Sequence, residues 1–397
     1  MTSAGDKGGG ANPSAPAAAG EAHLLPAGLQ DVLPPQAAHE AATIERLLAC
    51  LAGHGYERVK PPLIEFEETL LAGAGAALAP QTFRLMDPVS QRMMGLRADM
   101  TTQVARIAAS RLSRQARPLR LCYAGQVLRV KGSQLRPERQ FAQVGAELIG
   151  PLADSADAEV VLTASEALDS LGVQELSVDL TLPPLVGAIA RGLGIDPATG
   201  DDLRAALDRK DAAAVAEVAG PHADLFEAVL EAAGPVGAAL ERLQALSLPE
   251  EAAQGLAQLA RVISLIRARR PDLTMTLDPS EHRGFEYQTG VSFTLFARNV
   301  RGELGRGGRY DTAANGGQGE PATGFTLYMD SVLRALPQPA PQQRVFVPAD
   351  AQTERAAALR AEGWATVQGL EPVTDAQAEG RRLGCSHALV DGELVAL

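Results

Sequence analysis

Residues 125–150 read GQVLRVKGSQLRPERQFAQVGAELIG, and this stretch decides the fold. The segments 118–129 and 139–149 alternate apolar and polar side chains well enough to predict two strands. The loop between them, VKGSQLRPE, is polar and carries Gly132 and Pro137, which favour a turn. We therefore predict that the two strands run antiparallel.

Further strand signals appear after a long block that is rich in Ala and Leu. The block covers about 183–270 and is predicted to be helical, as is 155–171, whereas strands are predicted at 273–277, 287–296 and 325–329. The chain thus has predicted strands first, then a helical block, and then strands again. This order is typical of an antiparallel α+β domain with an insertion, and not of a doubly wound βαβ fold. We therefore predict an α+β core in which helices flank an antiparallel sheet.

The two ends of the chain differ from this core. Residues 1–20 are dominated by Gly, Ala, Ser and Pro without a hydrophobic segment, which predicts a disordered tail and not a signal peptide. QPAPQQ at 338–343 predicts a linker, and the residues after it alternate strand and helix signals. The predicted parts are therefore a tail at 1–20, a core domain at 21–338 with the insertion inside it, and a small α/β domain at 339–397.

Composition restricts the class of protein. The chain has 397 residues, of which 46% are hydrophobic and 21% charged, as in soluble globular proteins of about two to three domains. Its net charge of −12 argues against a large phosphate-binding surface, because nucleic-acid binders present clustered Lys and Arg. The three cysteines lie far apart and form neither a metal motif nor a disulfide framework, which predicts a reducing cytoplasm. No apolar run reaches the roughly 18–20 residues of a membrane helix.

Four segments of the chain resemble the active-site strands of histidyl-tRNA synthetases, which are class II aminoacyl-tRNA synthetases. They are residues 125–150, RGFEYQTG at 283–290, GGRYD at 307–311 and ATGFTLYMDSVLR at 322–334. The resemblance covers roughly residues 24–338 and is specific because the segments occur together, in the family's order and spacing. It implies the class II synthetase fold, with a C-terminal unit shorter than the family's anticodon-binding domain.

One segment of the resemblance concerns assembly. YERVKPPLIEF at 56–66 predicts a strand interrupted by Pro61 and Pro62, and proline confines a strand to a sheet edge or an interface because it cannot donate to the ladder. Class II synthetases place a proline-bearing strand of this kind, motif 1, at their dimer interface. The resemblance therefore implies a homodimer through this strand, whereas the residues alone also allow a simple edge strand.

The resemblance also implies a pocket for an amino acid. Gln143 and Glu147 are four residues apart on a predicted strand, so that both face one side; the family uses these positions for the α-amino group and the imidazole of histidine. LRADMTT at 96–102 resembles the family's LRPEGT, which places Asp99 at the ammonium and Thr101 beside it. The chemistry is coherent, because a buried cation needs a carboxylate partner.

Four further positions complete the implied site. Arg283 matches the arginine that steadies the substrate carboxylate and the α-phosphate, a task that suits the planar guanidinium fork. Tyr287 and Tyr310 match tyrosines of the pocket wall, and Arg129 remains as a residual phosphate contact. Any one of these residues alone is more often part of an ordinary strand face, and only the set predicts a pocket.

Several positions that serve ATP in the family carry different chemistry here. Lys131 replaces the Glu that accepts a hydrogen bond from the adenine amino group, and an ammonium has only donors. Asp330-Ser331 replaces the Glu-Arg pair of motif 3, which removes the arginine that lies against the triphosphate. Tyr328 stands where the family has Gly and is expected to fill space near the adenine, and Arg334 is not expected to replace the missing arginine.

These losses favour a family of synthetase-like chains, the regulatory subunits of ATP phosphoribosyltransferase, the first enzyme of histidine biosynthesis. This resemblance implies a non-catalytic chain without cofactor, metal or tRNA, which joins a catalytic short-form subunit in a hetero-oligomer and makes it responsive to histidine. Such a response is a coupling of roughly 1–3 kcal/mol between two sites.

Three other hypotheses remain open from the residues. An active histidyl-tRNA synthetase needs an intact ATP site and a full anticodon domain. A free-standing enzyme that activates an amino acid tolerates the loss of that domain but not of the motif 3 arginine. A structural module with a vestigial pocket differs from a regulatory subunit only in binding no ligand.

Overall fold

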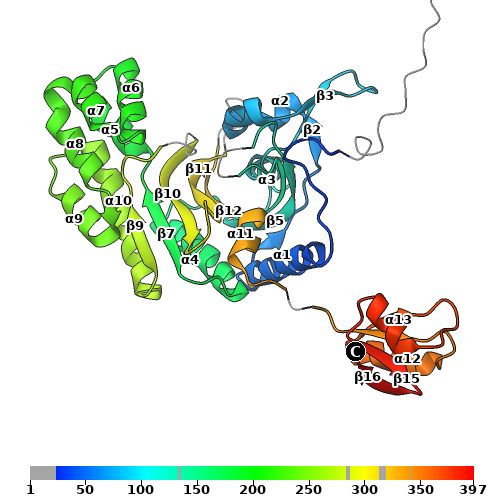
Figure 1. Ribbon diagram of the computed structural model, residues 1–397. Coiled ribbons are helices and arrows are strands. Elements are labelled where there is room, and N and C mark those ends of the chain that lie inside the picture. The colour runs from blue at the N-terminus through cyan, green and yellow to red at the C-terminus, as the bar shows by residue number, and fades with distance from the viewer. Residues whose placement is uncertain (1–23, 133–135, 283–286, 313–318, 340) are drawn as a thin grey trace, which may run out of the picture. The chain divides into compact units, whose positions relative to one another are not determined.

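The computed structural model describes residues 24–132, 136–282, 287–312, 319–339 and 341–397. Its contacts divide the chain into two units, which Figure 1 shows in one view. The larger unit ends at Pro337, and the smaller unit begins at Gln338 and also takes in Leu33–His39.

A nine-stranded sheet forms the centre of the larger unit, with the strand order β1-β5-β6-β12-β11-β10-β7-β9-β8. Every neighbouring pair from β5 to β7 is antiparallel, whereas β1 joins β5 and β9 joins β7 in parallel. The strands are β1 (Glu57–Arg58), β5 (Leu119–Leu128), β6 (Gln140–Ile149), β7 (Leu176–Thr181), β8 (Gly234–Pro235), β9 (Thr274–Leu277), β10 (Gln288–Ala297), β11 (Gly305–Asp311) and β12 (Pro321–Tyr328). The predicted α+β class with a largely antiparallel sheet is confirmed.

The side chains of strand β6 point alternately to the two faces of the large sheet. A different apolar cluster covers each face. Val144, Ala146 and Leu148 belong to a large apolar cluster that includes α4 (Asp154–Leu171). Phe141 and Ile149, on the opposite face, belong to a smaller cluster with α3 (Thr101–Ser110) and several tyrosines. The polar residues Gln143 and Glu147 share this second face, which makes it the face of the candidate site.

The other helices of this unit lie around the sheet and beyond its β7–β9 end (Figure 1). Those near the N-terminus and after β12 are α1 (Gln36–Gly53), α2 (Glu67–Leu70), the 3-10 helix η1 (Gly73–Gln81) and α11 (Met329–Ala335). The helical block between β7 and β9 contains α5 (Pro184–Gly192), α6 (Pro197–Asp208), α7 (Ala212–Ala219), η2 (Gly220–His222), α8 (Ala223–Glu231), α9 (Val236–Gln244) and α10 (Glu250–Arg269). Its buried Leu203, Phe226 and Ile263 belong to the large apolar cluster, so the block shares the core of the unit.

The proline pair divides the predicted motif 1 strand into two short strands in different sheets. Strand β1 lies at the edge of the large sheet, and β2 (Ile64–Phe66) lies at the edge of a three-stranded sheet with β4 (Met93–Leu96) and β3 (Arg84–Met86). The carbonyl oxygens of the prolines accept hydrogen bonds from side chains: Pro61 from Arg97 at 3.1 Å and Pro62 from Gln103 at 2.8 Å. Because proline has no N–H, the segment cannot continue a ladder.

The smaller unit contains a four-stranded sheet in the order β14-β13-β15-β16. Strand β13 runs parallel to both neighbours, and β16 is antiparallel to β15. Its elements are β13 (Arg344–Val347), α12 (Thr353–Ala361), β14 (Ala365–Gln368), α13 (Ala376–Arg382), β15 (His387–Val390) and β16 (Glu393–Ala396). Two apolar clusters, centred on Val345 and on Phe346, contain only residues of this unit.

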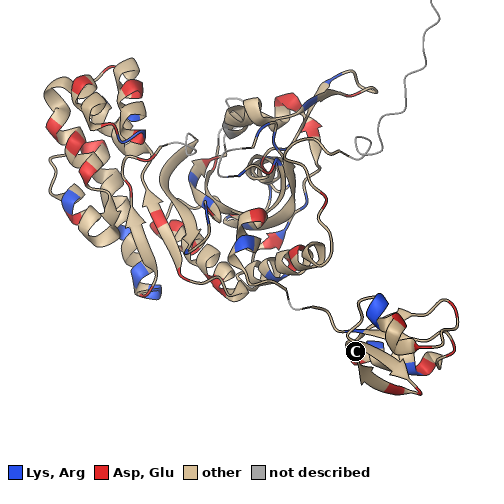
Figure 2. Cartoon of the chain, viewed as in Figure 1, with Lys and Arg blue, Asp and Glu red and all other residues tan. Residues whose placement is uncertain are grey.

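The hydrophobicity and the charge of the helices limit which partners the protein can have. Within the described part of the chain, no helix is both long enough and apolar enough to cross a bilayer. In Figure 2 many positions on the helices of the inserted block carry the colour of acidic residues. Residues 196–231 contain nine acidic and three basic side chains, so this part of the surface disfavours polyanions.

Candidate functional site

Five of the residues predicted from the sequence line one small cavity on the tyrosine-bearing face of the sheet. They are Asp99, Thr101, Glu147, Tyr287 and Tyr310. Strands β6 and β11 supply Glu147 and Tyr310, and the start of α3 supplies Thr101. The cavity measures about 30 Å³, which is room for about two water molecules.

Glu147 is fully buried at the base of this cavity. Its Oε1 accepts a hydrogen bond from the Tyr123 hydroxyl at 3.1 Å, and its Oε2 accepts one from the Tyr310 hydroxyl at 2.9 Å. The Tyr123 oxygen also lies 2.7 Å from Thr326 Oγ1 and 3.2 Å from Thr101 Oγ1. Tyr123 and Tyr310 therefore fix the carboxyl group, and the Tyr123 hydroxyl is in turn held by Thr326 and Thr101.

Burial raises the pKa of Glu147 from 4.5 to about 8. The hydroxyls of Tyr310, Thr101 and Tyr123 act in the opposite direction, because they stabilise the ionised form, while the negative charge of Asp99 raises the pKa further. Burial in this environment therefore favours the protonated form of the carboxyl group.

Gln143 lies behind Asp99 and does not line the cavity. Its Nε2 donates to Asp99 Oδ2 at 2.8 Å, and its Oε1 accepts from the Met100 backbone N–H at 3.2 Å. Asp99 Oδ1 also accepts from the Thr101 backbone N–H at 2.9 Å. Gln143, which is fully buried, therefore holds the Asp99 carboxylate at the cavity, whereas the resemblance implied direct contact with a ligand.

Two glycines make room for these side chains. Gly324 faces Glu147 across the β6–β12 pair, and a Cβ at position 324 would lie 1.9 Å from Glu147 Oε2. Gly145 faces Tyr123 across the β5–β6 pair, and a Cβ there would lie 2.4 Å from the Tyr123 hydroxyl. A glycine inside a strand often marks such a close approach.

The sequence did not identify three residues of the site. Tyr123 and Thr326 complete the hydroxyl network, and Arg306 lines the cavity with an ion pair to Glu303 at 2.5 Å. Alternation along β5 could have indicated Tyr123, since it stands opposite Gly145, two residues from Glu147. Arg283, which the resemblance assigns to the substrate carboxylate, lies outside the described residues.

Arg129 lies in a second hollow of about 280 Å³, separate from the cavity of Glu147. This hollow is also lined by Lys131 and Arg136. The Arg129 guanidinium carbon is 5.1 Å from the centre of the Phe141 ring, and Nε donates to the Ala98 carbonyl at 3.3 Å. The residual phosphate contact and the amino-acid residues thus do not share one cavity.

Arg136 lines the second hollow, Tyr328 lines the cavity of Glu147, and these two side chains contact each other. The guanidinium carbon of Arg136 is 3.8 Å from the centre of the Tyr328 ring, a cation–π distance. Arg136 also pairs with Asp330 at 3.2 Å and with Glu303 at 3.5 Å, and it is only 8% exposed. Tyr328 is buried and stands edge-on to Phe141.

Arg334 comes closer to the motif 3 position than the sequence suggested. It reaches back one helical turn, so that Nη2 donates to Ser331 Oγ at 2.9 Å. Its charge is already matched by Asp330 at 3.5 Å and by Glu138 at 3.7 Å. It is therefore no substitute for an unpaired phosphate-binding arginine.

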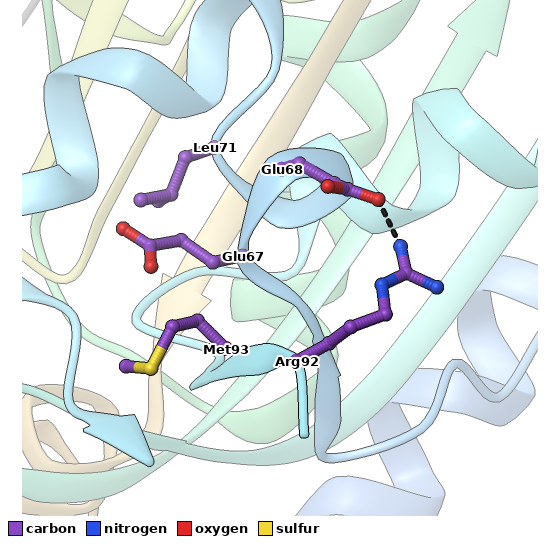
Figure 3. A pocket seen from close by; sticks show the side chains of 5 residues that line it. All are labelled: Glu67, Glu68, Leu71, Arg92 and Met93. Atoms are coloured by element: carbon purple, nitrogen blue, oxygen red, sulfur yellow. Dashed lines mark hydrogen bonds and ion pairs between the residues drawn. The ribbon is translucent and has the colours of Figure 1, made fainter. Parts of the chain in front are cut away.

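A third hollow, of about 370 Å³, lies between α2 and β4, away from these residues (Figure 3). Among the described residues of its lining, Arg92 is the cation; it pairs with Glu68, and its guanidinium carbon is 3.5 Å from the Phe66 ring centre. These described residues offer no convergent set of buried polar groups, so we assign the hollow no ligand. Across the described residues, no three His, Cys, Asp or Glu side chains are grouped as metal ligands.

The chain is similar to known proteins along most of its length. A family model of histidyl-tRNA synthetase matches residues 28–332. The ATP phosphoribosyltransferase regulatory subunit of Paramagnetospirillum magneticum is 61% identical over 366 residues, which are 92% of this chain and 96% of that protein. The protein of the same name from Rhodospirillum centenum is 57% identical over 371 residues, covering 94% and 95% of the two chains.

Solved structures show the same fold. A crystal structure from Bacillus halodurans, described as an ATP phosphoribosyltransferase regulatory subunit/histidyl-tRNA synthetase, has a TM-score of 0.78 at 26% identity and covers 91% of this chain and 96% of its own. Histidyl-tRNA synthetase from Nostoc has a TM-score of 0.77 at 18% identity, over 93% and 91% of the chains, which is a likeness of fold alone. The chain therefore belongs to the ATP phosphoribosyltransferase regulatory subunits, a family built on the histidyl-tRNA synthetase fold.

Proposed function

We propose that this chain assembles with a catalytic short-form ATP phosphoribosyltransferase, activates it and conveys histidine feedback to it, without catalysing a reaction itself. The observation that carries this proposal is the contrast between two halves of one ancestral site. The amino-acid half keeps Asp99 and Glu147 at a cavity, whereas in the nucleotide half this chain's own Arg136 and Tyr328 occupy the space.

The amino-acid half of the site, which keeps Asp99 and Glu147, supports histidine as the ligand. Asp99 and Glu147 can receive an ammonium and an imidazole, which are the two basic groups of histidine. The cavity of about 30 Å³ is too small for an amino acid, so binding requires its walls to move. A ligand that favours one arrangement of the protein over another can shift the equilibrium between them, and a catalytic partner can sense that shift.

The nucleotide half of the site, which contains Arg136 and Tyr328, supports a non-catalytic role. An incoming triphosphate has to displace Arg136 from Asp330, Glu303 and the ring of Tyr328. It also meets the uncharged Ser331 at the position where the family has an arginine. Phosphoryl chemistry depends on positively charged groups that are held in place around the phosphates. The acidic surface of residues 196–231 adds a reason why tRNA is not a ligand.

Two further parts of the proposal concern assembly and location. We place a homodimer contact at the motif 1 segment, because β1 and β2 each lie at a sheet edge and edges are available for pairing. A twofold contact of this kind uses the same patch on both copies. We place the protein in the cytoplasm, where Cys50, Cys122 and Cys385, which are free thiols, stay reduced.

Reconstitution tests the main proposal. The chain is expected to co-purify with a catalytic short-form subunit, to raise its phosphoribosyltransferase activity and to make that activity sensitive to histidine. Failure to bind the catalytic subunit, or binding with no change in its rate, contradicts the proposal.

A second assay tests the absence of catalysis. ATP–pyrophosphate exchange with histidine is expected to stay at background for the full chain. Robust exchange indicates an active amino-acid-activating enzyme and overturns the non-catalytic assignment.

A further inference from the structure

The turn between α6 and α7 of the inserted block carries a lysine in an unfavourable backbone conformation. Lys210 stands two residues after the end of α6 at Asp208, and its φ is +57°. Helices most often place glycine at this position, because a Cβ is disfavoured in the left-handed region. The backbone of the turn alone therefore favours glycine, and the use of lysine has to be explained by its side chain.

The Lys210 side chain holds the segment that follows β9, which comprises residues 278–282. Its Nζ lies 2.6 Å from each carboxylate oxygen of Asp278 and 2.6 Å from Ser280 Oγ. Ser280 is only 2% exposed, and its backbone N–H and its hydroxyl both donate to Asp278 Oδ1, at 3.1 and 2.9 Å. The three donors of the ammonium are thus all directed to one segment of the chain.

A second side chain from the end of α6 holds the other end of this segment. Asp208 Oδ1 accepts a hydrogen bond from the His282 backbone N–H at 3.1 Å. Lys210 holds the beginning of the segment at Asp278, two residues further along the same turn. The inserted block therefore attaches both ends of residues 278–282.

The attached segment is linked to the ligand cavity in two ways. Tyr287 follows His282 closely in the chain and lines the cavity. Burial and two neighbouring carboxylates raise the pKa of Glu281 to about 7, whereas the positive charges of Arg306 and Lys210 act in the opposite direction. Because Arg306 lines the cavity, Glu281 is within electrostatic range both of the lysine and of a cation of the site.

We propose that Lys210 and Asp208 are positioning residues for the ligand cavity, through which the inserted block fixes residues 278–282 and thereby sets the affinity of the site. The inference rests on the proposed function, because it takes the cavity as the histidine site. Neither residue is among the described residues that line the cavity, so both act through the segment and not on the ligand. A partner that shifts the α6–α7 turn then changes the affinity for the ligand, and by linkage the ligand changes the affinity for that partner.

Amide hydrogen exchange of the full-length chain without ligand tests the attachment. Lys210→Gly removes the ammonium and adds no backbone strain, because glycine adopts positive φ readily. We expect the amides of residues 278–282 to exchange about tenfold faster in K210G than in the wild type. The unfolding temperature is expected to stay within about 3 °C, which separates the attachment from an effect on overall stability. Unchanged exchange in this segment overturns the inference.

Calorimetric titration with histidine tests the effect on the cavity. K210G is expected to bind histidine about fivefold more weakly than the wild type, a change typical of residues that act on a site without touching its ligand. Lys210→Arg keeps a cation that can pair with Asp278 and is expected to keep most of the affinity. Asn299→Gly is the matched control, since Asn299 is exposed and has φ of +62°, and it is expected to leave the affinity unchanged. Equal affinities of K210G and the wild type overturn the inference.

A variant of the other partner keeps the test available if K210G is unstable. Asp278→Asn removes the charge with which Lys210 pairs and is expected to weaken histidine binding by a similar factor. The double variant K210G/D278N is expected to bind no more weakly than either single variant, because both changes break one contact; additive losses contradict the inference. If the wild type itself binds no histidine, the ligand assignment of the proposed function fails, whereas normal binding by the wild type and by both variants overturns only the role of Lys210.

Discussion

At the residue scale, a single carboxyl group determines much of the chemistry of this site. Glu147 can be buried because Gly324 opposite it has no side chain, and a Cβ there would lie 1.9 Å from Oε2. Tyr123 and Tyr310 then satisfy its oxygens without neutralising it. Because burial raises the pKa of this group, its protonation is linked to folding.

The pH dependence of stability follows from this linkage. The pKa of Glu147 is 4.5 when exposed and about 8 in the fold, so between these values the unfolded chain has lost a proton that the folded chain keeps. The contribution of Glu147 to stability therefore falls by about 1.4 kcal/mol per pH unit across this window, to a total on the order of 5 kcal/mol, and this contribution is constant outside the window. We expect E147Q to lack this component, so that its free energy of unfolding falls less across the window than that of the wild type.

Urea unfolding between pH 4 and pH 9 measures this effect. A matched control is Glu217→Gln, since Glu217 is exposed and its replacement is expected to leave the shape of the wild-type profile unchanged. Parallel profiles for E147Q and the wild type show that Glu147 ionises normally in the fold and refute the prediction.

At the scale of elements, one buried ion pair joins α4 to the sheet. Asp157 of α4 and Arg309 of β11 are 2% and 6% exposed, and Arg309 Nε donates to Asp157 Oδ2 at 3.0 Å. Arg309 also donates to the carbonyls of Pro151 and Ala153 at the start of α4. The pair thus anchors the first turn of this helix next to the strand that carries Tyr310.

Loss of one partner from this pair is expected to be costly. Arg309→Met leaves a buried carboxylate without its counter-ion and is expected to lower the free energy of unfolding by about 3–5 kcal/mol at pH 7. The double variant D157L/R309M removes both charges and is expected to recover most of that loss. Chemical denaturation measures both.

An exposed pair provides the comparison. Arg298 and Glu175 lie 2.7 Å apart with side chains 66% and 59% exposed, so R298M is expected to change stability by less than about 1 kcal/mol. If R309M and R298M have equal effects, the buried pair is not the anchor that its geometry suggests.

At the scale of the whole molecule, the two units have separate apolar cores. The clusters of the larger unit contain no residue beyond Leu336 among those described, and the clusters around Val345 and Phe346 begin at residue 345. We therefore expect a chain truncated after Pro337 to melt within about 3 °C of the corresponding full-length transition, because a shift of that size reflects only about 1 kcal/mol. Scanning calorimetry of the two proteins measures this, and a much lower melting temperature for the truncated chain contradicts independent cores.

The amino-acid sequence by itself determined the α+β class, the antiparallel pairing of β5 with β6 and the common face of Gln143 and Glu147. These features are local, because the alternation of a strand and the chemistry of a turn are written in consecutive residues. The resemblance to histidyl-tRNA synthetases, and not a local pattern, indicated Asp99, Thr101, Tyr287 and Tyr310.

Only the tertiary structure decided how these residues act. Tyr123 bonds to Thr326, 203 positions away, and Arg136 reaches Asp330 and Tyr328 from a distant loop, so no local pattern shows these contacts. The cavity's size, the place of Gln143 behind Asp99 and the raised pKa of Glu147 depend on which groups the fold brings together and how far it excludes water. Distance and burial control these energies, and a linear sequence contains neither quantity.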